Sequence, residues 1–196
     1  YINNIKPGKY KIEKGSSNNE IVNNLRINKL TVNVVFNNQE RLEDFALRIS
    51  KQIMADSLSL IKSFLDPEFL NQKGFDSLNA LAMYVPNSFD FFWDVSPKKF
   101  RNRMWKEYKS FWTKELEIKA KKINLTKIEV FILASIVQKE SLKQIEKTRI
   151  AGVYLNRLKR NIKLQADPTV IYSIKKETNN FKQIIKRVLY KDLKIK

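Results

Sequence analysis

Histidine and cysteine are both absent from the 196 residues of this chain. Without histidine, the chain can build neither a Ser-His-Asp triad nor an imidazole metal site. Without cysteine, it has no thiol nucleophile, no disulfide and no thiolate zinc site. Any acid–base chemistry must therefore use Asp, Glu, Tyr or Lys side chains, and we expect no metal or other cofactor.

Long apolar runs and chain breakers are also scarce. No stretch of about 18 or more uncharged apolar residues occurs, so no membrane span is expected within these residues. No signal peptide begins at Tyr1, and we expect the sequence to start in the middle of a longer protein. With only 4 Gly and 5 Pro in the chain, helices should dominate the fold.

Positive charge, in contrast, is abundant. The chain holds 38 Lys and Arg against 20 Asp and Glu, which gives a formal net charge of +18. Such a charge suggests an anionic partner, which could be nucleic acid, acidic lipid or an anionic polymer. The basic residues are spread along the chain and match no nucleic-acid-binding motif, so we expect no nucleic-acid partner. A single basic helix is predicted over residues 98–122, either as a solvated face or as a surface for lipid head groups or wall polymer.

The hydrophobic pattern predicts an α+β fold in which a small β-α-β part precedes a mainly helical part. Residues 9–12 alternate like a short strand, and residues 30–36 are rich in β-branched side chains typical of a strand. Ser17 and Glu20 between them have the spacing of a capping box, which opens a short helix. This small β-α-β part needs a neighbouring strand to complete its sheet. Apolar residues at helical spacing then predict an amphipathic helix over residues 42–53.

The most apolar helix is predicted to follow a second capping box at Thr126 and Glu129. Because apolar side chains occur on nearly every side of it, we expect it to be buried on nearly every side.

Glu140 lies at the end of this helix and is the first candidate for chemistry. It follows Ile136 by four residues and Val137 by three, so it shares their apolar face. A carboxyl at the rim of such a face is desolvated, stays protonated nearer neutral pH and can act as a general acid. The alternative is an ordinary glutamate at a helix end that points to solvent or pairs with Lys143 or Lys147.

A polar break at residues 164–169 is the second candidate. Pro168 favours an extended backbone at Asp167. In an extended segment the alternate residues Gln165, Asp167 and Thr169 would face the same side. The alternative is that Asp167 and Pro168 simply start the next helix, with Asp167 as its cap.

Aromatic residues gather at residues 89–93, between Pro86 and Pro97. Such a cluster is either part of the core or a platform on which the C–H face of a sugar stacks. The sequence alone leaves both readings open.

Three segments in this order resemble the MltG (YceG-like) family of endolytic peptidoglycan transglycosylases. They are ASIVQKE at residues 134–140, RIAGVYLNRL at 149–158 and LQADPTVIY at 164–172. The segment YVPNSFDFFW at residues 84–93 is similar to a proline-aromatic segment of that family, and PGKYKI at 7–12 is similar to its LysM-like part. The resemblance implies a LysM-like region over residues 1–76 and a catalytic domain over residues 77–196.

The resemblance also implies an activity. The catalytic role falls on Glu140, because the family's other glutamate in this motif is replaced here by Gln138. One carboxyl would protonate the leaving oxygen of the MurNAc–GlcNAc bond and then take the proton of the sugar's 6-hydroxyl, which gives a 1,6-anhydro end. The side chains expected around the sugar are Gln165, Asp167, Asn156 and Thr169.

The family further implies peptidoglycan strands as substrate and cell wall synthases as partners. It implies an inner-membrane anchor before Tyr1, a catalytic part facing the periplasm, and a further segment after Lys196, so we expect the catalytic domain to be truncated. The other interpretation is a non-catalytic module that binds glycan without cutting it.

Overall fold

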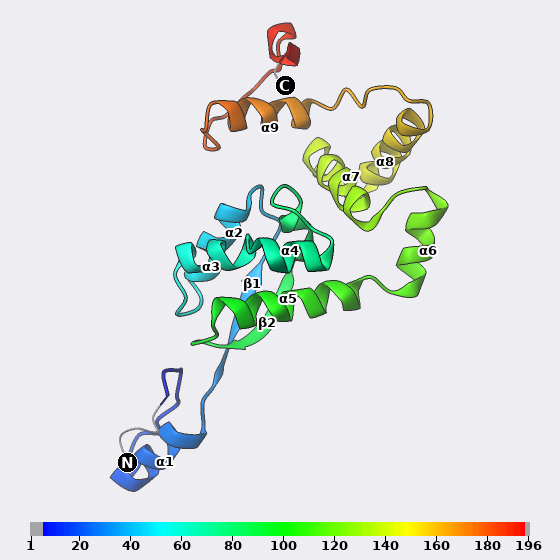
Figure 1. The fold of residues 1–196 in the computed structure, drawn as a ribbon. Coiled ribbons are helices and arrows are strands. Elements are labelled where there is room, and N and C mark those ends of the chain that lie inside the picture. Colours follow the sequence, from blue (N-terminus) through cyan, green and yellow to red (C-terminus); the bar gives the residue numbers. More distant parts are fainter. Residues whose placement is uncertain (1–5, 195–196) are drawn as a thin grey trace. The chain divides into compact units, whose positions relative to one another are not determined.

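The computed structural model describes residues 6–194, so the chain ends Tyr1 and Lys196 lie outside the described part. The fold is mixed α+β and mainly helical, as the sequence predicts (Figure 1). It forms two compact units, one ending at Thr113 and one beginning at Lys114, and each is described by itself. The functional division at residue 76 stays a prediction.

The first unit begins with helix α1 (Asn18–Ile27), which opens with the expected capping box. The Ser17 hydroxyl accepts a hydrogen bond from the Glu20 amide (3.3 Å), and the Glu20 carboxylate accepts one from the Ser17 amide (2.7 Å). The strand predicted at residues 9–12 is reduced to one isolated bridge between Lys9 and Leu30.

The chain beyond Leu30 pairs with the aromatic segment. Strand β1 (Thr31–Phe36) pairs antiparallel with β2 (Asn87–Phe92), with Val34 opposite Phe89. The neighbouring strand that the β-α-β part requires therefore comes from more than 50 positions further along the chain, since register places Thr31 opposite Phe92.

Strand alternation divides the aromatic cluster between two environments. Phe89 and Phe91 are buried, whereas Phe92 and Trp93 are 49% and 39% exposed. The core interpretation therefore holds for Phe89 and Phe91, whereas stacking of a sugar on the two exposed rings stays a prediction.

Helices of the first unit pack against one face of these two strands (Figure 1). They are α2 (Leu42–Ser50), α3 (Ser57–Phe64), α4 (Pro67–Lys73), the 3-10 turn η2 (Ala80–Met83) and α5 (Pro97–Phe111). Helix α2 buries the predicted apolar face, which comprises Leu42, Phe45, Ala46 and Ile49. Helix α4 ends where the sequence has a glycine, because Gly74 takes the left-handed backbone conformation (φ 77°) that glycine adopts readily.

The core of the first unit is built around Phe45. Its ring centroid lies 4.8 Å from that of Phe36 and 4.5 Å from that of Tyr84. Phe64 and Phe100 lie 5.4 Å and 6.3 Å away. Rings from β1, α3, α5 and the segment before β2 thus meet on one side chain of α2, and such pairs stabilise the core beyond simple burial.

The second unit is helical throughout its regular elements. These are α6 (Lys114–Lys122), α7 (Lys127–Glu140), α8 (Gln144–Lys159), α9 (Asp167–Glu177) and the 3-10 turn η3 (Tyr190–Lys194). The single basic helix predicted over residues 98–122 is wrong, because α5 ends at Phe111. Trp112 leaves the helical region of backbone space (ψ 74°), and its side chain is buried.

Helix α7 begins with the predicted capping box at Thr126 and Glu129. The prediction that it is buried on nearly every side is wrong for the part of the chain that the structure describes. Only Leu133 and Val137 of this helix are buried, and Ile132 is 47% exposed. Helices α8 and α9 cover one face of α7, so the opposite apolar face stays accessible.

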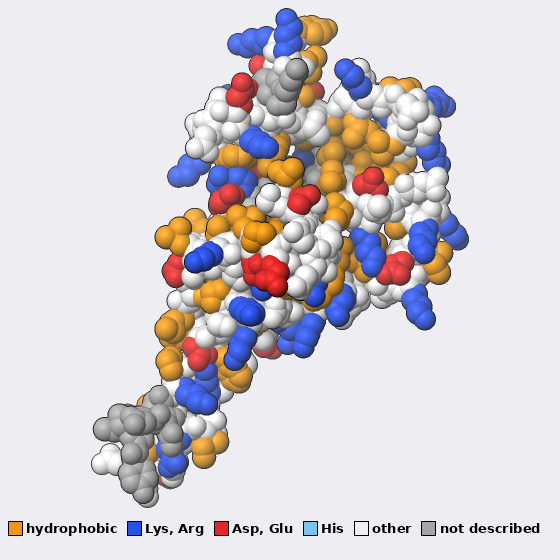
Figure 2. All heavy atoms as spheres, viewed as in Figure 1, with side chains coloured by type: hydrophobic (Ala, Val, Ile, Leu, Met, Phe, Trp, Pro, Cys, Tyr) orange, Lys and Arg blue, Asp and Glu red, His pale blue; other side chains and the backbone are white. Residues whose placement is uncertain are grey.

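Basic side chains are spread over the face of the molecule shown in Figure 2 and are interspersed with acidic ones. None of the helices described between residues 6 and 194 has the length and hydrophobicity needed to cross a membrane.

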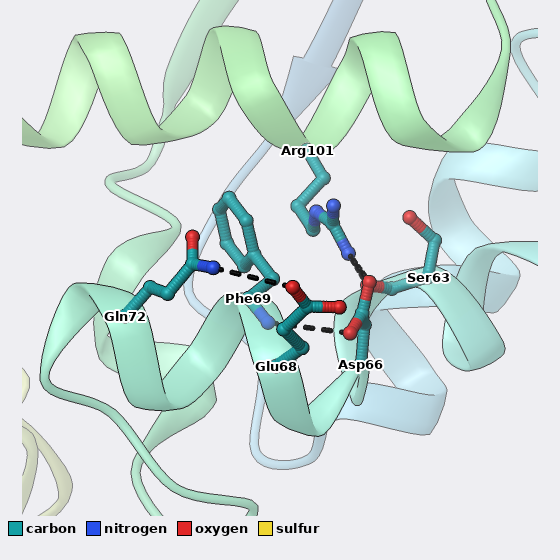
Figure 3. Close-up of polar contacts among 6 residues, drawn as sticks. All are labelled: Ser63, Asp66, Glu68, Phe69, Gln72 and Arg101. Carbon is teal, nitrogen blue, oxygen red and sulfur yellow. Dashed lines mark hydrogen bonds and ion pairs between the residues drawn. The ribbon is translucent and has the colours of Figure 1, made fainter.

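One charged side chain is buried in the first unit. Arg101 of α5 has a side chain only 4% exposed, and it donates hydrogen bonds to the Asp66 carboxylate (2.8 Å) and the Ser63 carbonyl (2.6 Å). Its guanidinium lies 3.7 Å from the ring centroid of Phe69 (Figure 3). Asp66 also caps α4 by accepting a hydrogen bond from the Phe69 amide (3.2 Å). The pair therefore joins the end of α3, the start of α4 and the middle of α5.

The hydrogen bond from Arg101, followed by that from the Phe69 backbone, holds the pKa of Asp66 below its ordinary value. A carboxyl whose pKa is lowered by folding stabilises the fold above its ordinary pKa and loses this effect as the pH falls through the folded-state pKa. We predict that Asp66→Asn lowers the urea midpoint at pH 7, and that its difference from the parent shrinks below about pH 4.

Asp44→Asn is the control for urea unfolding between pH 3 and pH 7, since Asp44 pairs with the more exposed Arg41 at 2.7 Å. This substitution should lower the urea midpoint less than Asp66→Asn does, because exposed ion pairs contribute little to the free energy of unfolding. An unchanged midpoint for Asp66→Asn at pH 7 would contradict the role of this pair.

Candidate active site

Glu140 is the last residue of α7, and its side chain is exposed. The expectation of a desolvated carboxyl at the rim of an apolar face is therefore wrong. Burial along α7 ends at Val137, about one turn before Glu140. The alternative pairing with Lys143 is not what the structure contains either, since the Lys143 ammonium lies 3.4 Å from Glu146.

Tyr154 of α8 is the side chain that the structure places against Glu140. Its side chain is buried, with 5% of the residue exposed. The residues buried around it are Leu133, Val137 and Ala166. Its ring thus fills the core between α7, α8 and the segment that leads into α9, while its hydroxyl reaches the end of α7.

The charges around this hydroxyl show which groups it faces. Burial raises the pKa of Tyr154, and the charge of Glu140 and a hydrogen bond with its carboxylate raise it further. The Arg157 guanidinium lowers the same pKa, and the charge of Asp167 raises it again. Tyr154 therefore lies in the field of both acidic candidates, which come from helices α7 and α9.

Arg157 holds the segment between α8 and α9. Its guanidinium donates hydrogen bonds to the Leu164 carbonyl and to the side-chain oxygen of Gln165, the latter at 3.1 Å. Gln165 takes a left-handed backbone conformation (φ 51°), which is unusual for a residue with a side chain. Tyr154 and Arg157 are three residues apart on α8 and so lie on one face of this helix. The same face therefore packs in the core through Tyr154 and binds the segment between α8 and α9 through Arg157.

The prediction that Gln165, Asp167 and Thr169 face the same side of an extended segment is wrong. Gln165 is left-handed, and Asp167 is already the first residue of α9. Within a helix, residues two apart point about 200° away from each other, so Asp167 and Thr169 diverge. The Thr169 hydroxyl instead donates to the Ala166 carbonyl at 2.7 Å.

The capping alternative for Asp167 is also not realised, because the N-cap position of α9 is Ala166 and makes no side-chain cap. Pro168 does occupy the first turn, where its fixed φ suits the start of a helix.

Asn156 lies apart from this group. It follows Tyr154 by two residues and is therefore about 200° around α8 from the buried ring, with its side chain exposed. The structure thus brings Glu140 to Tyr154, leaves Asp167 with only a weak electrostatic effect on the same tyrosine, connects Gln165 to Arg157, and leaves Asn156 and Thr169 outside these contacts. The catalytic and substrate-binding roles assigned to all five residues stay predictions.

Sequence reasoning missed Tyr154 and Arg157. A signal was present, because Tyr154 follows Ile150 by four residues and so lies on the apolar face of its helix. A polar aromatic side chain on such a face needs a partner for its hydroxyl. The residues of the described part contain no group of three or more side chains suited to holding a metal ion.

The contact between Tyr154 and Glu140 can be tested by titration. We predict that Glu140→Gln lowers the pKa of Tyr154 toward its ordinary value without reaching it, because the charge is lost while burial remains. Asp167→Asn should lower this pKa as well, through its charge. The measurement is an NMR titration of protein labelled with carbon-13 at the tyrosine Cζ, with Tyr154→Phe to assign the signal.

Glu177→Gln removes an exposed carboxylate from the end of α9 and serves as the matched control, which should leave the Tyr154 titration unchanged. If Glu140→Gln also left it unchanged, the two side chains would not be in contact.

Comparison with known proteins places the chain in a family. The profile of the YceG-like family matches residues 1–196. The chain is similar to the endolytic murein transglycosylase of Bacillus subtilis (strain 168), with 37% identity over 83 residues, which are 42% of this chain and 21% of that protein. The chain thus spans about a fifth of the length of this curated relative.

A crystal structure of a yceG-like protein from Listeria monocytogenes shares the fold, with a TM-score of 0.66 and 22% identity. The match covers 98% of this chain and 66% of that one. The family match extends over every residue of the sequence, and the chain therefore belongs to the YceG-like family.

Proposed function

We propose that this chain is part of an endolytic transglycosylase that cleaves the MurNAc–GlcNAc bond of nascent peptidoglycan strands without water. The product would carry a 1,6-anhydroMurNAc end, and cleavage would limit strand length during cell wall synthesis. Membership of the YceG-like family and the name of the Bacillus subtilis relative support this assignment.

The observation that carries the proposal is the contact between Glu140 and Tyr154. The carboxylate is exposed, so a polymeric substrate can reach it, yet its partner hydroxyl belongs to a ring that is buried. A catalytic group held by a packed side chain keeps its orientation when substrate binds. Tyr154 acts as a positioning residue in this proposal.

The reaction needs one carboxyl only. Protonated Glu140 gives its proton to the glycosidic oxygen as the bond to the MurNAc anomeric carbon breaks. The resulting carboxylate then accepts the proton of the 6-hydroxyl as that oxygen bonds to the same carbon. Atoms and charge balance without water, whereas hydrolysis by the usual route requires a second carboxylate.

Asp167 is assigned to substrate positioning. Its charge has the smallest of the effects on the pKa of Tyr154 described above, and Asp167 is the first residue of α9. An exposed carboxylate there can accept hydrogen bonds from sugar hydroxyl groups. Gln165, Asn156 and Thr169 are further proposed sugar contacts.

The cellular setting is part of the proposal. The full-length protein would be anchored in the inner membrane, with its catalytic part in the periplasm and cell wall synthases as partners. This setting suits an enzyme that cuts strands as they are made.

We predict that Glu140→Gln in the full-length protein abolishes the release of anhydro-ended products from peptidoglycan. Acid–base catalysis by a positioned group contributes about 10²–10⁴-fold to a rate, and an amide of the same shape cannot supply it. Products are identified by mass spectrometry, and circular dichroism checks the fold. Glu177→Gln should retain the parental rate, and product release at the parental rate by Glu140→Gln would refute the assignment.

Asp167→Asn separates positioning from proton transfer. A positioning role predicts a rate lower by about a hundredfold with the high-pH limb of the pH–rate profile unchanged, because Glu140 must start protonated and therefore sets that limb. A proton-transfer role predicts the loss of one limb. The profile is measured for the parent and for Asp167→Asn, and a lost limb would show that the positioning role is wrong.

A further inference from the structure

A concave site lies in the first unit, which contains none of the proposed catalytic residues. It is a pocket of about 430 Å³ lined by α4, α5 and Asp66 at the start of α4. This volume falls within the range typical of sites for small molecules. Figure 3 shows two of the lining residues, Phe69 and Arg101, between these two helices.

Lysines line the pocket on both sides. Lys98, Lys106 and Lys109 are spaced eight and three residues apart along one face of α5, and Lys73 comes from α4. Within residues 6–194, none of the four forms an ion pair with a carboxylate.

The two acidic side chains in the lining offset only part of this charge. Asp66 is paired with Arg101 at 2.8 Å. Glu68 keeps its negative charge, since its hydrogen bond at 3.4 Å comes from the neutral Gln72 amide, but it is one carboxylate against four lysines. The pocket therefore carries an excess of positive charge, and an anion placed there relieves the repulsion among the ammonium groups.

An aromatic ring lies among the lysines. The ammonium groups of Lys73 and Lys109 lie 5.9 Å and 5.7 Å from the ring centroid of Trp105. This indole is partly exposed, and it is stacked on Tyr108 with a centroid distance of 5.6 Å. A rigid indole flanked by two cations offers an apolar surface next to anion-binding groups.

The hydrogen-bond donors that line the pocket favour phosphate over carboxylate as the bound anion. The guanidinium of Arg101, which suits planar carboxylates, is buried: one nitrogen donates to both Asp66 and the Ser63 carbonyl, and its unpartnered Nε is shielded from solvent. The groups left for a ligand are lysine ammonium groups, which act as point charges and suit phosphate. The neighbouring indole suits the C–H face of a sugar ring.

We propose that the pocket between α4 and α5 binds a phosphorylated saccharide, with the phosphate on Lys73 and Lys109 and the sugar ring on Trp105. The ligand is either a soluble sugar phosphate or a repeating unit of a sugar-phosphate polymer, because both present the same chemistry. This site is separate from the proposed catalytic residues, and binding to it requires no cleavage.

The test is isothermal titration calorimetry on the full-length protein carrying Glu140→Gln, with N-acetylglucosamine 6-phosphate, N-acetylglucosamine and inorganic phosphate as probes. We expect the sugar phosphate to bind at least tenfold more tightly than either of the other two. Equal affinity for inorganic phosphate would overturn saccharide recognition, and equal affinity for the neutral sugar would overturn the role of the lysines. No binding of the sugar phosphate would overturn the proposal.

The double variant Lys73→Gln, Lys109→Gln should weaken binding of the sugar phosphate at least tenfold. The matched control Arg48→Gln, Lys51→Gln removes the same charge from exposed positions outside the pocket and should change affinity less than twofold. Equal losses in both variants would overturn the site, because they would show a general effect of net charge.

A sugar-phosphate oligomer distinguishes the two sources. If the oligomer binds more tightly than the monomer and loses this advantage in the lysine variant, the ligand is a polymer, and equal affinity per unit identifies a soluble sugar phosphate. Either result supports the pocket. Because calorimetry with the inactive variant measures no cleavage, failure here would leave the transglycosylase assignment untouched.

Discussion

The buried ring of Tyr154 is the constraint on which the candidate active site depends. It packs against Leu133 and Val137 of α7 and against Ala166, so helices α7 and α8 and the start of α9 meet on one side chain. Its hydroxyl is directed to Glu140, and the charge of Asp167 reaches the same group. Two acidic residues that are 27 positions apart in the sequence thus both raise the pKa of one tyrosine, which the hydrophobic core holds in place.

Features that depend on neighbouring residues could be predicted from the sequence. Both capping boxes and the buried face of α2 follow from spacings of three or four residues. The pairing of β1 with β2 could not be predicted in this way, because register between distant strands depends on tertiary packing. The break at Trp112 was hidden in a continuous helical pattern for the same reason, since burial of that side chain decides the backbone there.

In the candidate site, too, some features follow from local sequence and others depend on tertiary packing. Glu140 was identified from its place in the sequence, but its exposure depends on the packing around the end of α7. The alternation at residues 165–169 suggested one face, yet Gln165 adopts a left-handed conformation that no local pattern indicated. Tyr154 was missed because a tyrosine on an apolar face looks like any other core residue until the partner of its hydroxyl is known.

The left-handed backbone of Gln165 has a consequence for the kinetics of ligand capture. A non-glycine residue in this region costs about 1–2 kcal/mol, and the fold retains it while Arg157 holds both Gln165 and Leu164. The ordering of this loop is therefore completed during folding. A ligand that reaches the start of α9 meets a segment already in place, so association is limited by diffusion and orientation instead of waiting for the loop to close.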